Sequence, residues 1–239
     1  MSITETPTRI SGGDGSLRRV VQSLIDSESR APVGLEKRGT NNVVWNELKE
    51  LGYSMSAEEF ADTDPTDPRF CRFRPARFGN VVFCSDVGFG QFEQEVGRIT
   101  ERIRSWPKLF RSILPVLGSL RSLQRLDNLD ILNIYSTAPN IGPYRVFPNQ
   151  HLESNTLTHA WIEGDSHSQK MGRLYLTLLY WRLGKIPSQN ILRTTKSNVF
   201  YQDFNNGELW IDGDYLSTEQ SGKFVIERVN IPISITAIR

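Results

Sequence analysis

The sequence has no long hydrophobic run, few cysteines and no complete motif of a common enzyme class. Because no stretch of about eighteen apolar residues occurs among its 239 residues, the sequence does not predict a transmembrane helix. The first fifteen residues also lack the apolar segment of a secretory signal. We therefore expect a soluble, intracellular, cytoplasmic protein, for which peripheral membrane contact stays open.

Cysteine is represented only by Cys71 and Cys84. Two cysteines are too few for a four-ligand zinc site. Without a secretory signal we expect both thiols to be reduced, and a disulfide between them is the alternative.

Motifs for nucleotide, cofactor or nucleophilic chemistry are incomplete. The stretch "DVGFGQFEQEVG" supplies Gly88 and Gly90 of a G-x-G-x-x-G phosphate loop, but Glu93 occupies the third glycine position. We interpret it as a structural turn. The sequence contains no G-x-S-x-G nucleophile elbow, and we expect no cofactor and no metal.

The histidines suggest an alternative function as a metal-dependent hydrolase or nuclease. His151, His159 and His167 are spaced by eight residues, and Asp165 lies nearby. On one strand, neighbours eight apart would be about 26 Å from each other, so only a chain reversal could bring His159 and His167 together with carboxylates. We prefer exposed loop histidines, and we interpret the "DGD" of residues 212–214 as a turn.

Charge is segregated although the net charge is only +1. Residues 1–68 carry 7 basic and 12 acidic side chains, residues 69–125 carry 11 and 4, and residues 126–239 carry 10 and 11. We expect a flexible tail over 1–15, a helix-rich part over 16–128 with a basic band at 69–125, and a β-rich part over 129–239. The last two could form one continuous domain.

Helical patterns dominate the first half. "SLRRVVQSLIDSE" and "NNVVWNELKELG" place apolar residues at helical spacing, and Ser56 and Glu59 have the spacing of a capping box. A helical stripe from Ile99 to Leu120 is interrupted by Pro107 and Pro115, which predicts two or three short helices.

Strand patterns dominate from residue 130 onward. In "QDFNNGELW" the turn residues 205–207 predict an antiparallel hairpin of the two flanking runs. "RLYLTLLYWRL" favours a strand, with a buried helix as the alternative. The predicted fold class is α+β, with a helical N-terminal half followed by a mainly antiparallel β-sheet in the C-terminal half.

The basic band contains "RFCRFRPARFGNVVF", in which arginines alternate with aromatic residues. On a strand, Arg72 would point away from Cys71 and Phe73, so we expect charged contacts without base stacking. The predicted anion- or nucleic-acid-binding residues are Arg69, Arg72, Arg74, Arg77, Arg98, Arg102, Lys108 and Arg111.

Because enzyme motifs are absent and charge is segregated, we predict a non-enzymatic binding or assembly protein. It would be a structural or matrix-like component, such as a viral one, with homo-oligomers among its assemblies. Its anionic partner would be RNA or another nucleic acid, an acidic protein surface or a membrane surface. A merely solvated arginine face is the alternative.

Overall fold

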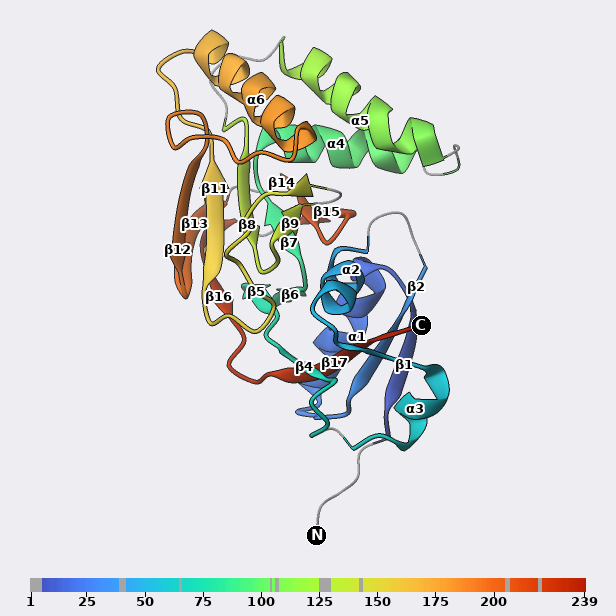
Figure 1. Cartoon of the computed structure of the whole chain (residues 1–239). Helices are drawn as coiled ribbons and strands as arrows, with labels where there is room; N and C mark the ends of the chain where they lie inside the picture. Colours follow the sequence, from blue (N-terminus) through green and yellow to red (C-terminus); the bar gives the residue numbers. More distant parts are fainter. Residues whose placement is uncertain are drawn as a thin grey trace.

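The computed structural model describes the chain apart from residues 1–5, 39–41, 65, 104, 106–107, 125–129, 142–143, 205–206 and 219–220. The described residues form two lobes (Figure 1). The lower lobe in this view contains both the first and the last strand, and the upper lobe is built from the middle of the chain.

The lower lobe is built on a largely parallel sheet, because its first three strands each lead into a helix. Its strand order is β1-β2-β17-β3, all parallel, with β4 antiparallel to β17. Every residue of β17 is buried, as expected for a strand covered on both faces. The elements are β1 (Thr8–Gly12), α1 (Asp14–Asp26), β2 (Val33–Lys37), α2 (Val43–Glu50), β3 (Ser54–Met55), α3 (Ala57–Asp62), β4 (Cys71–Phe73) and β17 (Ile233–Ile238).

The upper lobe contains two larger antiparallel sheets, in the orders β12-β11-β8-β7-β14-β15 and β13-β16-β5-β6, and the short pair β9-β10. Its helices α4, α5 and α6 lie together at the end remote from the lower lobe (Figure 1). The strands are β5 (Ala76–Phe78), β6 (Val81–Phe83), β7 (Asp86–Gly88), β8 (Asn133–Ser136), β9 (Asn140–Ile141), β10 (Tyr144–Arg145), β11 (Leu157–Trp161), β12 (Arg193–Ser197), β13 (Val199–Phe204), β14 (Gly207–Ile211), β15 (Asp214–Thr218) and β16 (Gly222–Arg228). The helices are α4 (Gln91–Arg102), α5 (Lys108–Leu123) and α6 (His167–Arg182).

The two lobes share a hydrophobic core. The chain leaves the lower lobe between β4 and β5 and returns between β16 and β17. Val82, Cys84 and Leu152 of the upper lobe pack into the same cluster as Leu17 and Val33 of the lower lobe. This shared packing fixes the upper lobe against the lower lobe.

The predicted division into a helical half and a β half is wrong. Strands run through the whole chain, and helices are confined to residues 14–26, 43–62, 91–123 and 167–182 within the described ranges. The prediction failed because parallel strands such as β2 and β17 pair across about 200 residues of chain and leave no local signal. Thr8–Gly12, placed in the predicted tail, form β1.

"RLYLTLLYWRL" is helical and not a strand. It lies in α6, where the Ser166 hydroxyl accepts from the Gln169 N–H and caps the N-terminus. Met171, Leu174 and Trp181 are buried at helical spacing. The alternating pattern in the sequence arose because the outer face of the same helix is also apolar.

The predicted hairpin around residues 205–207 is also wrong. Both flanking runs are strands, but β13 pairs with β16, whereas β14 pairs with β7 and β15. The tight hairpin lies one strand later, where Asp212 and Gly213 have φ of 50° and 84°. Two consecutive positive φ values are those of a type I′ turn, which favours Asp-Gly.

Several local predictions are confirmed. Helices form over both early amphipathic stretches, and α3 begins with the complete Ser56–Glu59 capping box. The stripe after Gly90 becomes α4 and α5, but Pro115 lies inside α5 and does not end it. Cys71 and Cys84 are buried free thiols. No helix of the described residues is long and apolar enough to cross a membrane.

Candidate functional site

A glycine-rich turn joins β1 to α1 at the carboxyl edge of the parallel sheet. The segment "SGGDGS", residues 11–16, ends the strand at Gly12 and begins the helix at Asp14, with Gly13 as an extended N-cap. A side chain at Gly12 would collide with the Ser16 hydroxyl, and one at Gly15 would collide with the carboxylate of Asp214. Both glycines thus lie close to neighbouring side chains, in the strand–turn–helix arrangement that presents backbone N–H groups to phosphate.

Asp14 fixes the geometry of this turn. Its carboxylate oxygens accept from the backbone N–H groups of Val43 and Val44, at 2.9 and 3.1 Å. These N–H groups belong to the first turn of α2, where they have no partner within the helix. The N-termini of α1 and α2 are thus joined through one buried carboxylate, and both lie at the same edge of the sheet.

Two further buried carboxyl groups come from the upper lobe. Asp212 accepts from the backbone N–H groups of Cys84 and Ser85 at 2.8 and 2.7 Å, and the Ser85 hydroxyl lies 3.0 Å from both Asp212 and Asp86. Burial is the main cause that raises the pKa of Asp86 to about 7 and that of Asp212 to about 6. Burial, and then the charge of Asp212, also raise the pKa of Asp14 well above its usual range. Asp14, Asp86 and Asp212 are called the carboxyl cluster below.

The lobes are linked directly beside the glycine turn. Arg18, in the first turns of α1, donates to the Asp214 carboxylate at 2.9 Å and to the Ile211 carbonyl at 3.4 Å. A small cavity of about 260 Å³ lies along this seam, lined by Arg18, Arg19, Gln22, Val81, Val82 and Leu216. Arginine side chains from α1 therefore face the space between the lobes next to the turn.

A larger cavity of about 550 Å³ opens at the carboxyl end of β2. Lys37, which is paired across the sheet with Gly12, lines it. Its Nζ lies 4.8 Å from the centre of the Trp45 ring, and Lys49 approaches the same ring at 5.3 Å. The other lining residues are Asn46, Glu50, Asn140 and Arg145, so both lobes contribute to it. Arg145 pairs with Glu50 at 3.5 Å, so Lys37 and Lys49 leave the cavity with an excess of positive charge, which favours an anionic ligand.

The other glycine-rich turn, between β7 and α4, is filled by protein. Added side chains at Gly88 and Gly90 would each collide with Glu93, which is buried. Burial raises the pKa of Glu93 to about 8. The interpretation of this stretch as a structural turn fits the side chain that occupies it.

The described members of the predicted anion-binding set are distributed over both lobes. Arg72 is on β4 in the lower lobe, whereas Arg98 and Arg102 are on α4 at the far end of the upper lobe (Figure 1). Arg72 is exposed between buried Cys71 and Phe73, as the alternation predicted. The side chains of Lys108 and Arg111 lie outside the description.

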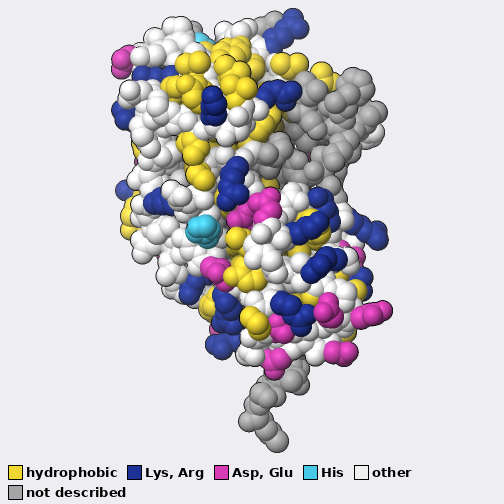
Figure 2. Space-filling model, in the orientation of Figure 1, with side chains coloured by type: hydrophobic (Ala, Val, Ile, Leu, Met, Phe, Trp, Pro, Cys, Tyr) yellow, Lys and Arg dark blue, Asp and Glu magenta, His cyan; other side chains and the backbone are white. Residues whose placement is uncertain are grey.

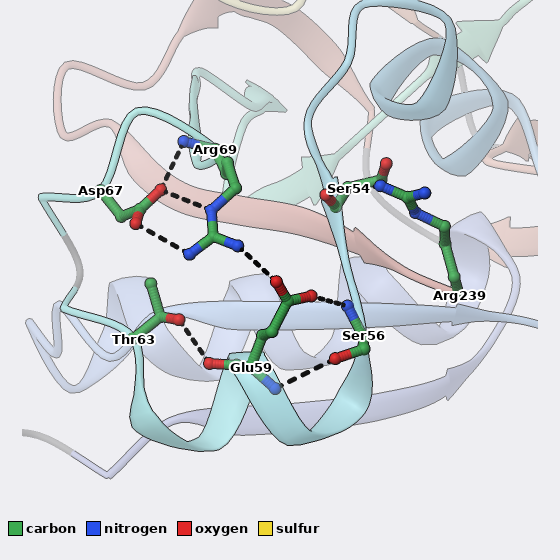
Figure 3. Close-up of polar contacts among 7 residues, drawn as sticks. All are labelled: Ser54, Ser56, Glu59, Thr63, Asp67, Arg69 and Arg239. Carbon is green, nitrogen blue, oxygen red and sulfur yellow. Dashed lines mark hydrogen bonds and ion pairs between the residues drawn. The ribbon is translucent and has the colours of Figure 1, made fainter.

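Most of the remaining arginines have partners within the chain. Arg69 pairs with Asp67 at 3.0 Å and with Glu59 at 2.9 Å, and Glu59 also accepts from the Ser56 N–H (Figure 3). Arg77 pairs with Glu227 at 2.9 Å, and Arg74 donates to the Asn230 carbonyl at 3.2 Å. Arg98 pairs with Glu95 at 2.5 Å. The acidic side chains that pair with arginines of the basic band therefore belong to this chain itself.

The histidines are not brought together. The His159 Nε2 atom lies 2.9 Å from the Asn133 amide oxygen, and its ring stacks between Tyr135 and Trp161. Burial lowers the pKa of His159 to about 4. His167 begins α6, and His151 is exposed. Across the described ranges, no three His, Cys, Asp or Glu side chains form a group that could hold a metal ion.

The residues that do converge were missed by sequence reasoning. Asp14, Asp86 and Asp212 are separated by more than 70 residues at each step of the chain, so no local pattern connects them. The signal that could have found the site is "TRISGGDGSLRRVVQSLI", a short β-branched run, a glycine cluster and an amphipathic helix.

No family model and no curated protein sequence matches this chain. Solved structures match it over nearly its whole length. Three come from Bacillus anthracis strain Sterne and are described as diacylglycerol kinases, two of them provisionally. The first has a TM-score of 0.66 at 14% identity, covering 97% of this chain and 78% of that chain. The second has a TM-score of 0.65 at 13% identity, with the same coverage of both chains.

At this identity the neighbours show the fold alone. Because the solved structures that share this fold are described as diacylglycerol kinases, the prediction of a non-enzymatic assembly protein is corrected. The expectations of a viral structural component and of an RNA-binding assembly protein are corrected with it. Within the described part of the chain, the alternative of a histidine-based metal hydrolase lacks the ligand group that it requires.

Proposed function

We propose that this protein is a kinase that binds nucleotide phosphates at the glycine turn of residues 12–16 and transfers a phosphoryl group to a hydroxyl. The main observation that supports this proposal is the position of the glycine turn. It ends β1 at the carboxyl edge of a parallel sheet, opposite Lys37 and beside a cavity that three cations line. Open α/β sheets bind ligands at this edge, and phosphates prefer backbone N–H groups at helix N-termini.

Phosphoryl transfer depends mainly on positioning and on stabilisation of negative charge. Lys37, Lys49 and Arg145 supply positive charge to the larger cavity. Asp14 would hold the N-termini of α1 and α2 in a fixed position relative to each other. Nucleotides carry Mg²⁺, which proteins usually hold through one or two carboxylates together with the phosphates. Asp214, whose side chain is 37% exposed, accepts from Arg18 at 2.9 Å and lies against Gly15, and it would supply a carboxylate for that contact.

The fold neighbours, which are described as diacylglycerol kinases, suggest the class of acceptor. We propose a lipid alcohol of that kind as the acceptor.

Nucleotide binding and transfer test the proposal separately. Calorimetry with a non-hydrolysable ATP analogue and Mg²⁺ should show saturable binding. Radiolabelled ATP should label diacylglycerol dispersed in detergent micelles. Lys37→Ala should weaken analogue binding by about tenfold, the loss expected for one charge-assisted contact. Lys223→Ala, an exposed lysine in β16 near Tyr201, is the matched control and should bind normally. A parent protein that neither binds the analogue nor labels a lipid would contradict the proposal.

A further inference from the structure

The outer face of α6 is apolar and uncovered by the described chain. Exposed fractions are 42% for Tyr175, 43% for Leu176, 52% for Leu179, 61% for Leu183 and 54% for Ile186. These positions recur at helical spacing along one side of α6 and into the turn that follows it. Figure 2 shows hydrophobic side chains with Lys and Arg among them over this end of the molecule. We call these five residues the α6 apolar face.

This face is not the side with which α6 packs on the protein. Met171, Leu174 and Trp181 are buried in the core of the upper lobe together with Ile134 and Ile162. The helix therefore has apolar residues on both its inner and its outer side, and the inner side already provides the contacts that hold it in place. Large exposed apolar patches on soluble proteins mark surfaces that another body covers.

The charge around this face is of one sign. Residues 166–202 contain six Lys and Arg and no Asp or Glu. Arg182 and Lys185 are exposed and flank Leu183, within the α6 apolar face itself. Of the nearest acidic residues, Glu163 is occupied by Arg193 at 3.0 Å, and Asp165 lies before the helix begins.

We propose that the α6 apolar face docks on a lipid surface that carries anionic headgroups. Leucine and tyrosine side chains at this spacing would enter the boundary between headgroups and acyl chains, and the flanking cations would contact lipid phosphates. A second copy of this chain fits less well. In a two-fold interface Arg182 and Lys185 would face their own counterparts, or one another, without a carboxylate between them.

The inference does not rest on the proposed kinase activity, because the surface is remote from the glycine turn. α6 lies at the end of the upper lobe, whereas the turn lies at the junction of the lobes (Figure 1). Docking can therefore be measured without nucleotide or acceptor. A negative result for membrane docking would leave the proposed kinase activity untouched, and the reverse also holds.

Vesicle flotation of the full chain provides the test. The parent should float with phosphatidylcholine vesicles that contain roughly one third phosphatidylglycerol, and less with phosphatidylcholine alone. Leu179→Ser with Leu183→Ser should reduce vesicle binding by at least about tenfold for each leucine. The control pair Leu51→Ser and Ile231→Ser removes two exposed apolar side chains elsewhere and should bind as the parent does.

A second pair of variants tests the charges. Arg182→Ala with Lys185→Ala should abolish the preference for anionic vesicles, as should about 0.5 M salt. Arg30→Ala with Lys223→Ala removes the same charge from other exposed positions and should keep the preference. The proposal is overturned if the parent floats with neither vesicle, or if control and α6 variants lose binding equally. It is also overturned if sedimentation shows a parent dimer that the leucine variant converts to monomer.

Discussion

Asp86 is a carboxyl group that the fold removes from water. It is 4% exposed and lies beside the Ser85 hydroxyl and the carboxyl of Asp212. Burial and then the charge of Asp212 raise its pKa from 3.8 to about 7. Between pH 3.8 and about pH 7, the Asp86 carboxyl group is protonated in the folded protein and ionised in the unfolded chain. Its contribution to the free energy of unfolding is therefore full below pH 3.8 and is lost as the pH rises through about 7.

Asp86→Asn should flatten the pH dependence of stability. Asparagine cannot ionise, so the variant should lose less stability than the parent between about pH 4 and about pH 7. The difference is at most about 1.4 kcal/mol for each pH unit in that window. Urea unfolding across this range measures it. Asp203→Asn, an exposed aspartate on β13, is the control, and coincident pH curves for parent and Asp86→Asn would refute the assignment.

Ser56 closes the capping box that begins α3. Its hydroxyl accepts from the Glu59 N–H at 3.1 Å, and its own N–H donates to the Glu59 carboxylate at 2.7 Å (Figure 3). Ser56→Ala should lower the free energy of unfolding by about 1 kcal/mol, the usual cost of removing an N-cap. Ser188→Ala, at an exposed serine after α6, should change it by less than about 0.5 kcal/mol. Equal losses in chemical denaturation would show that the box does not stabilise α3.

At the scale of elements, the stretch "RLYLTLLYWRL" can be tested as a helix against the strand that its alternating pattern predicted. In a strand, Leu174 and Leu176 would share a face, whereas in α6 Leu174 is fully buried and Leu176 is 43% exposed. Leu174→Ala should therefore cost about 2–5 kcal/mol, and Leu176→Ala less than about 0.5 kcal/mol. Thermal or urea unfolding of both variants provides the comparison. Similar losses would favour the strand.

Elements defined by local signals could be predicted, and those defined by distant pairing could not. The amphipathic spacing of α1 and α2 and the Ser56–Glu59 box are contained within about one or two helical turns, and the sequence predicted all three. β1 is a five-residue strand without aromatic residues, held by parallel pairing with β2. Because that partner follows a whole helix later, the stretch resembled a mobile tail.

The hairpin error has a comparable cause. Residues 205–207 and residues 212–213 both have turn chemistry, and local preference alone did not choose between them. The choice is made by long-range packing. β14 is aligned by β7, and Asp212 is held by the N–H groups of Cys84 and Ser85. The carboxyl cluster is likewise a product of the assembled lobes, so only its glycine turn was open to sequence reasoning.

On the scale of the whole molecule, the candidate site exists only while the lobes stay joined. Asp14 belongs to the lower lobe, and Asp86 and Asp212 belong to the upper one. Arg18 connects the two through Asp214. Because the main core of the lower lobe includes upper-lobe side chains, exposing one lobe to solvent would open the core of the other. We therefore expect the chain to unfold as one cooperative unit.

Leu152→Ala tests this unity. Leu152 precedes β11 in the upper lobe and is fully buried in the core that also contains Leu17 and Val33. Its truncation should cost about 2–5 kcal/mol. In native-state hydrogen exchange, the most protected amides of β2 and β8 should lose the same free energy of opening, because both exchange through global unfolding. Leu51→Ala, at an exposed leucine after α2, should leave both unchanged. A loss confined to β2 would mean that the lobes open separately, and the carboxyl cluster would then assemble only when they close.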